Sequence, residues 1–179
     1  MTKQTKTPIK ICLFGSESTG KTTLAKLLAA HYDTEWVPEM AREILGDRKC
    51  VPADFPIIAE AQVAEINRKS LIANKLLICD TDLLTTMLYE KIYFGSVNET
   101  VSALQKHDKY DLYLFLESDI PWIEDSQRDL GGARRLEIRN MFEAALIDQK
   151  INYVVIKGNF ENRLQAAIFA IDTFLSEAK

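Results

Sequence analysis

Cysteine, histidine and long apolar runs are scarce in this chain of 179 residues. Its three cysteines, Cys12, Cys50 and Cys79, lie far apart in the sequence, and two of them stand inside apolar runs. An odd number of separated cysteines does not indicate a disulfide framework, and buried cysteines of this kind are typical of a reducing compartment. The two histidines, His31 and His107, lie far from any cysteine or acidic cluster at ligand spacing. The sequence therefore predicts no protein-bound zinc site.

A basic excess and a membrane-spanning segment are also missing. The net charge is −4 and the sequence pI is about 5.3, whereas a nucleic-acid-binding surface normally shows as a cluster of basic residues. No apolar run approaches the roughly 20 residues that span a bilayer, and the N-terminal stretch MTKQTKTPIK lacks the apolar core of a signal peptide. We therefore expect a cytoplasmic protein that binds neither nucleic acid nor a membrane.

What the sequence does contain is an alternation of strand-like and helical patterns. Short, nearly all-apolar runs are separated by segments whose apolar residues recur at helical spacing. The strand-like runs are 9–14, 35–37, 76–79, 112–116 and 153–156. Buried strands that alternate with helices are typical of a parallel sheet covered on both faces. We predict one α/β domain over residues 1–179, interrupted late by a polar, irregular stretch at 117–135.

A glycine-bearing turn between the first strand and the first helix carries the strongest motif. It matches G-x-x-x-x-G-K-[ST] and is followed by a second threonine; the residues are Gly15, Ser16, Glu17, Ser18, Thr19, Gly20, Lys21, Thr22 and Thr23. Such glycines let backbone N–H groups point at an anion, and the helix start adds the positive end of its dipole. Lys21 would reach the β- and γ-phosphates, and the Thr22 hydroxyl would bind Mg²⁺. The motif therefore predicts ATP and Mg²⁺ as cofactors.

Two carboxylates, Asp80 and Asp82, follow the third strand-like run. Ligands of open parallel sheets bind at the carboxyl ends of the strands, so acids at this place can face a bound nucleotide. Asp80 is the better candidate for the shell of the Mg²⁺ ion, as in a Walker B motif. Asp82 either contacts a second substrate or only begins the next helix, where an acid is favoured by the helix dipole.

A third acid, Glu39, comes directly after the second strand-like run. At that strand end it would lie across the cleft from the phosphate-binding loop, where a carboxylate can accept the proton of an attacking hydroxyl group. Arg42 follows three residues later and would share a helix face with Glu39. We predict that both contact the acceptor and that Glu39 is catalytic. The alternative is a surface helix whose charges are solvated.

Three arginines flank a Gly-Gly pair in the polar stretch 117–135: Arg128, Arg134 and Arg135. Guanidinium groups suit phosphate by their planar shape and permanent charge. A segment hinged at glycines can close over a transferring phosphoryl group and exclude water. We predict a lid here, with Arg128 as a catalytic residue and Arg134 and Arg135 as nucleotide-binding residues, the alternative being a solvated loop.

Taken together, these segments resemble the ribosylnicotinamide kinase domain of the bifunctional bacterial NAD-biosynthesis proteins. The resemblance is carried by GSESTGKTTLA, PEMAREIL, CDTDLLTT and WIEDSQRDLG, which occur in the family's order and cover nearly the whole chain. It implies a P-loop kinase of the AAA-domain NTPase superfamily, with a five-stranded sheet in the order 2-3-1-4-5. The implied reaction transfers the γ-phosphate of ATP to the 5′-hydroxyl of nicotinamide riboside and gives nicotinamide mononucleotide.

Two departures from the family pattern bear on function. Met40 stands where an aromatic residue often follows the first glutamate, so the identity of the phosphate acceptor stays open. No H-x-G-H motif occurs, so no adenylyltransferase activity is expected. The alternatives are a kinase for another nucleoside or small hydroxyl acceptor, and a regulatory NTP-binding module that hydrolyses slowly. No N-K-x-D sequence for guanine is present, which argues against a GTPase.

Overall fold

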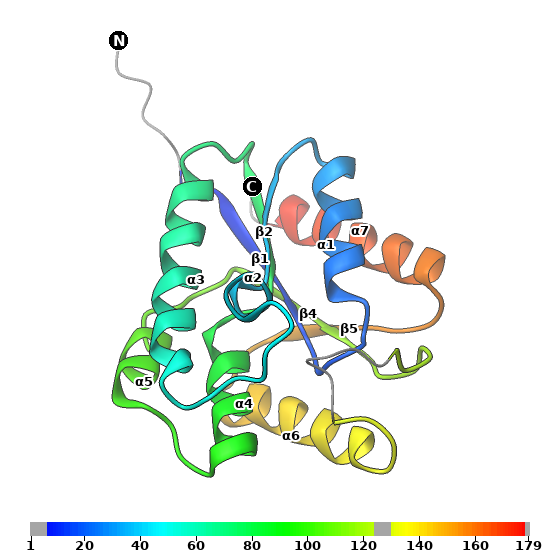
Figure 1. Ribbon diagram of the computed structural model, residues 1–179. Coiled ribbons are helices and arrows are strands. Elements are labelled where there is room, and N and C mark those ends of the chain that lie inside the picture. Colours follow the sequence, from blue (N-terminus) through cyan, green and yellow to red (C-terminus); the bar gives the residue numbers. More distant parts are fainter. Residues whose placement is uncertain (1–6, 124–129, 178–179) are drawn as a thin grey trace.

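The computed structural model describes residues 7–123 and 130–177 (Figure 1). The strands are β1 (Ile9–Phe14), β2 (Glu35–Val37), β3 (Leu76–Asp80), β4 (Leu112–Leu116) and β5 (Tyr153–Ile156). They form one sheet of parallel strands in the order β2-β3-β1-β4-β5. This confirms the predicted class, the strand positions and the strand order. The central strands β3 and β4 are buried along their whole length, which explains why they are almost entirely apolar.

Helices cover both faces of the sheet, as predicted. Their bounds are α1 (Lys21–His31), α2 (Met40–Leu45), α3 (Asp54–Ser70), α4 (Leu83–Phe94), α5 (Glu99–Gln105), α6 (Arg134–Asp148) and α7 (Phe160–Glu177). Helices α1 and α7 pack on one face, and α3, α4 and α6 pack on the other (Figure 1). The short helix α5, which was not predicted, lies against α3 and α4 and buries Val101.

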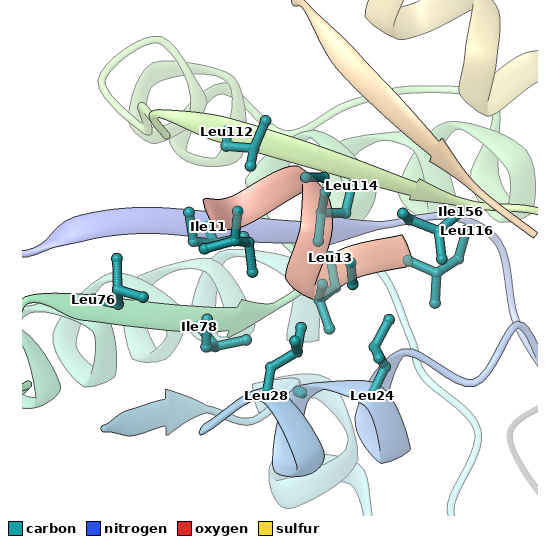
Figure 2. Close-up of a cluster of buried hydrophobic side chains, with 14 residues drawn as sticks. Ile11, Leu13, Leu24, Leu28, Leu76, Ile78, Leu112, Leu114, Leu116 and Ile156 are labelled. Carbon is teal, nitrogen blue, oxygen red and sulfur yellow. The ribbon is translucent and has the colours of Figure 1, made fainter. Parts of the chain in front are cut away.

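The alternation of side chains along each strand divides the core into two parts. On the α1 and α7 side, Leu13 and Leu114 meet Leu24 and Leu28 of α1 (Figure 2). On the other side, Phe14 packs against Phe142 of α6, with ring centroids 5.3 Å apart. Because both faces of the central strands are buried, the functional side chains are left to the loops at the carboxyl ends of the strands.

A buried arginine of α7, Arg163, ties three of these loops together. Its guanidinium donates to the carbonyl of Gly158 (2.7 Å), to that of Thr19 in the β1–α1 loop (2.7 Å) and to that of Glu117 after β4 (2.9 Å). It also pairs with the carboxylate of Asp119. Its planar fork of donors is suited to such a site, and lysine would not replace it. The position of the β1–α1 loop therefore depends on a residue far along the chain.

We expect Arg163→Met to lower the free energy of unfolding by about 3–5 kcal/mol, because several buried acceptors would lose their donor. Denaturant unfolding followed by circular dichroism measures this change. The matched control is Arg68→Met, since Arg68 pairs with Glu65 on an exposed part of α3 and exposed pairs contribute little. An effect of Arg163→Met no larger than that of the control would contradict the role given to this guanidinium.

Candidate active site

The turn between β1 and α1 has the geometry of a phosphate-binding loop. Lys21 is the first residue of α1, and its Nζ donates to the carbonyl oxygens of Gly15 (2.8 Å) and Ser16 (2.9 Å). The hydroxyl of Thr19 donates to the Ser16 carbonyl as well, at 2.9 Å. These bonds curl the loop back on itself and place the lysine ammonium within the curl. Helix α1 begins here, so its free N–H groups and the positive end of its dipole face the same space.

Both motif glycines are required by the local geometry. Gly15 has a φ of 150° and Gly20 a φ of 83°, which are backbone conformations that other residues rarely adopt. Space is short as well: a Cβ on Gly15 would lie 2.9 Å from the Leu116 carbonyl oxygen, and one on Gly20 would lie 2.9 Å from a ring carbon of Phe160. The two glycines therefore allow the loop to pack against the end of β4 and the start of α7.

The structure brings Thr22 and Asp80 together. The Thr22 hydroxyl donates to Oδ2 of Asp80 at 2.5 Å, across the ends of β1 and β3. The other carboxylate oxygen, Oδ1, is buried and has no hydrogen-bond partner among the described residues. Burial, together with the negative charge of Glu39, raises the pKa of Asp80 to about 6. A carboxylate with an unused oxygen beside a threonine hydroxyl fits a Mg²⁺ ion, which binds few protein ligands and keeps waters and phosphate oxygens.

A cavity extends from this loop to an aromatic chamber between α3 and α4. On one side lie the loop residues 17–23, and on another lie Glu39 and Arg42 of the β2–α2 region. The chamber itself is lined by Phe55, Ile58, Tyr89, Tyr93 and Phe94. The rings of Tyr89 and Tyr93 are nearly parallel, with centroids 6.0 Å apart. The cavity therefore has a polar end, suited to phosphates, and an apolar end, suited to a flat organic group.

Glu39 and Arg42 lie where these two ends meet. Glu39 immediately precedes the first turn of α2, and Nε of Arg42 lies 3.5 Å from its carboxylate. Both side chains are partly exposed and line the cavity. The negative charge of Glu39 contributes, after burial, to the raised pKa of Asp80. A carboxylate in this position can reach a hydroxyl group held between the chamber and the phosphates.

Asp82 lies apart from the other predicted site residues. Its carboxylate caps α4, accepting the Thr85 N–H at 2.8 Å, and also accepts the hydroxyl of Tyr113 at 3.0 Å. It is fully buried, does not line the cavity, and its pKa is raised to about 7 by burial and by the charge of Asp108. This geometry favours the second of the two interpretations, a residue that begins the helix, over a contact with substrate.

The two acids diverge because of the residue between them. Thr81 has a φ of 85°, which is rare for a β-branched residue, and its N–H donates to the Leu13 carbonyl at 3.1 Å. This left-handed turn sends the side chain of Asp80 toward the loop and that of Asp82 toward α4. Strain of this kind is often found at functional sites, and Thr81 itself lines the cavity.

The predicted lid is described only in part. Arg128 lies outside the described residues, so its role stays a prediction. Arg134 and Arg135 form the first turn of α6 rather than part of an irregular loop. Arg134 is exposed, whereas Arg135 donates to the Ser18 carbonyl at 3.2 Å and lies over the ring of Trp122. Burial and the charge of Arg163 lower the pKa of Arg135.

Two other contacts join the described parts of the polar stretch to the phosphate-binding loop. The N–H of Ile123 donates to Oγ of Ser18 at 2.9 Å, and that of Leu130 donates to Glu17 at 3.4 Å. Glu17 also accepts the Tyr93 hydroxyl at 3.0 Å. The loop is therefore in contact with both the polar stretch and the aromatic chamber.

Sequence reasoning missed several polar residues of the cavity, including Arg48, Tyr93 and, the most deeply buried of these three, Gln62. It is 1% exposed, lies on α3 and lines the cavity. Its Oε1 accepts the N–H of Met40 at 3.0 Å, and its Nε2 has no hydrogen-bond partner among the described residues. The signal was available: Phe55, Ile58, Gln62 and Ile66 follow helical spacing, and a glutamine in such an apolar series is unusual.

Comparison with known proteins places the chain in a family. A family model for an AAA domain matches residues 10–163, so the chain belongs to the AAA domain family. It is 29% identical over 177 residues to the trifunctional NAD biosynthesis/regulator protein NadR of Escherichia coli (strain K12), covering 94% of this chain and 43% of that protein. The chain thus spans less than half the length of this relative. This likeness confirms the resemblance to bacterial NAD-biosynthesis proteins.

Solved structures with the same fold include kinases. The structure of NadR protein in complex with NR has a TM-score of 0.77 and 23% identity, covering 95% of this chain and 52% of that one. Thymidylate kinase from Ehrlichia chaffeensis has a TM-score of 0.65 and 17% identity, covering 94% of this chain and 99% of that one. These likenesses confirm the P-loop kinase fold. Among the residues described here, no helix has the length and apolar character needed to cross a membrane.

The capping role of Asp82 can be tested by two substitutions. Asp82→Asn should leave the protein at least as stable as wild type, because asparagine caps helices about as well as aspartate and removes a buried charge. Asp82→Ala should lower the free energy of unfolding by about 1–2 kcal/mol. Asn98→Ala removes the exposed cap of α5. It serves as the reference for the loss of unfolding free energy when a helix cap is removed. If Asp82→Asn unfolds as easily as Asp82→Ala, capping does not explain this residue.

Proposed function

We propose that this protein is an ATP-dependent kinase that phosphorylates the 5′-hydroxyl of nicotinamide riboside and gives nicotinamide mononucleotide. The observation that carries the proposal is the cavity itself, which joins a phosphate-binding loop to an aromatic chamber and has Glu39 at the junction. The likeness to NadR, whose name states a role in NAD biosynthesis and whose structure was solved with NR, supports this acceptor. A cytoplasmic location follows from such a role in NAD metabolism.

The reaction needs positioning and charge neutralisation from the protein. Lys21 and the N–H groups at the start of α1 would hold the β- and γ-phosphates. Thr22 and Asp80 would hold Mg²⁺, which neutralises charge on the phosphate oxygens. Glu39 would orient the 5′-hydroxyl and accept its proton as that oxygen bonds to the γ-phosphorus. The bond from phosphorus to the bridging oxygen breaks at the same time, and ADP leaves with that oxygen.

The chamber suits the ring of the proposed acceptor. Nicotinamide riboside carries a flat, positively charged pyridinium ring, and aromatic faces attract such cations. The chamber offers Tyr89 and Tyr93, and the carboxylates of Glu17 and Glu39 lie on the same cavity.

The test of the proposed function is ADP release with Mg-ATP, measured with nicotinamide riboside, with other nucleosides and without any acceptor. We expect nicotinamide riboside to stimulate ADP release far above the control without acceptor. A kinase for another nucleoside predicts stimulation by that nucleoside instead. A regulatory NTP-binding module predicts slow ADP release that no acceptor changes, and that result would overturn the proposal.

Removal of the loop lysine should nearly abolish transfer. We expect Lys21→Ala to lower kcat by roughly 10³-fold or more, because a cation at the transferring phosphoryl group stabilises the charge of the transition state. Lys26→Ala is the control, since Lys26 is an exposed lysine of the same helix. Wild-type turnover by a folded Lys21→Ala protein would exclude this loop as the active site.

Replacement of the proposed base should separate transfer from ATP binding. We expect Glu39→Gln to lower kcat by roughly 10²–10⁴-fold, because it keeps the shape of the side chain and removes its basicity. ATP affinity, measured by calorimetry, should stay close to that of wild type. Glu43→Gln, at an exposed position of α2, the helix that Glu39 precedes, serves as control. Lost ATP affinity together with unchanged turnover would rule out this role for Glu39.

A further inference from the structure

The side-chain amide of Gln62 has a hydrogen-bonded oxygen and a nitrogen that has no partner among the described residues. Its side-chain oxygen accepts the Met40 N–H at 3.0 Å, which ties α3 to the start of α2. An amide presents its oxygen and its nitrogen in different directions, so Nε2 is directed away from that bond. The two N–H donors of Nε2 meet no acceptor among the described residues, although the atom is buried.

An unused buried donor calls for a partner. Leaving such a group without one is unfavourable by roughly 1–3 kcal/mol, and most buried polar groups in proteins are hydrogen-bonded. Gln62 lines the cavity described above, and a molecule bound there could supply an acceptor atom. The acceptor atom would then belong to the bound molecule.

The surroundings of Gln62 indicate which part of a bound molecule it meets. Phe55 and Ile58 precede it along the same face of α3, and Tyr89 of α4 lines the same cavity. These are apolar and aromatic groups, which suit a flat ring rather than phosphates. A neutral donor among them selects a ring that carries an uncharged acceptor atom at its edge.

We propose that Gln62 selects the acceptor by donating a hydrogen bond from Nε2 to a carbonyl oxygen on its ring. The inference rests on the proposed function, since it assumes that a ring-bearing nucleoside occupies the chamber. In nicotinamide riboside the carbonyl is that of the carboxamide group. The bond from Met40 holds the amide in place, so little freedom is lost when the ring enters.

A purely structural role for Gln62 makes a different prediction. If the side chain only anchors Met40, it acts through α2 and the adjoining Glu39, and its loss affects every acceptor equally. Two substitutions separate the roles. Gln62→Glu keeps an oxygen for the Met40 N–H and removes the donors of Nε2. Gln62→Met removes both.

The experiment compares nicotinamide riboside with the pyridinium riboside that lacks the carboxamide group. For wild type we expect kcat/KM to favour nicotinamide riboside by roughly 10- to 100-fold, the range expected for one buried hydrogen bond. In Gln62→Glu this preference should fall to nearly one. In Gln62→Met the preference should also disappear, and both ribosides should be used less well. Calorimetric titration of the two ribosides measures the same preference in Kd, independently of turnover.

Four outcomes decide the question. Loss of the preference in both variants supports the proposal. If the preference survives in both variants and Gln62→Met lowers kcat/KM equally for the two ribosides, the proposal is overturned. Gln62 then serves only to anchor α2. Selective binding without phosphorylation by wild type would overturn the proposed function but support this role for Gln62, whereas no binding of either riboside would overturn both.

Discussion

The site depends on the register between β1 and β3. Leu13 lies opposite Asp80 in the parallel pair, so the last residue of β3 stands beside the start of the phosphate-binding loop. A slip of one residue would reverse the face to which each β3 side chain points, and Asp80 would no longer meet Thr22. The buried apolar residues on both faces of these strands therefore fix the position of the proposed metal ligands as well as the core.

The same sheet edge also gathers negative charge. Burial raises the pKa of Asp80, and the negative charge of Glu39 raises it further. Two acids this close are unfavourable unless cations lie nearby, and Lys21 and Arg42 lower that same pKa. The arrangement suits a magnesium nucleotide. Its metal ion would place positive charge beside the two carboxylates, and its phosphates would pair with the ammonium group of Lys21.

Much of the fold could be predicted from the sequence, because its signals are local. The apolar runs gave the strands, and the loop motif gave Lys21, Thr22 and their place between a strand and a helix. The strand order came from the resemblance to a known family rather than from the runs themselves. The short helix α5 lacks a long periodic pattern and was missed.

The roles of individual polar residues were harder to predict, because they depend on contacts distant in sequence. Asp82 and Asp80 look alike in the sequence, and only the left-handed turn at Thr81 separates a helix cap from a candidate metal ligand. Gln62 interrupts an apolar helical series, which marks it as unusual in the sequence, but its partner, the Met40 N–H, lies on another helix and could not be predicted. Buried polar atoms without partners are visible only once the chain is folded.

The position of Arg163 has a consequence for the order in which the protein matures. The residue that holds the Thr19 carbonyl is separated from it by 144 positions. A ribosome makes the phosphate-binding loop before it makes Arg163, so the nascent loop lacks this support until α7 has been synthesised. Nucleotide binding that requires the supported loop therefore has to wait for α7. ATP would then stabilise, by mass action, only chains that already contain this helix.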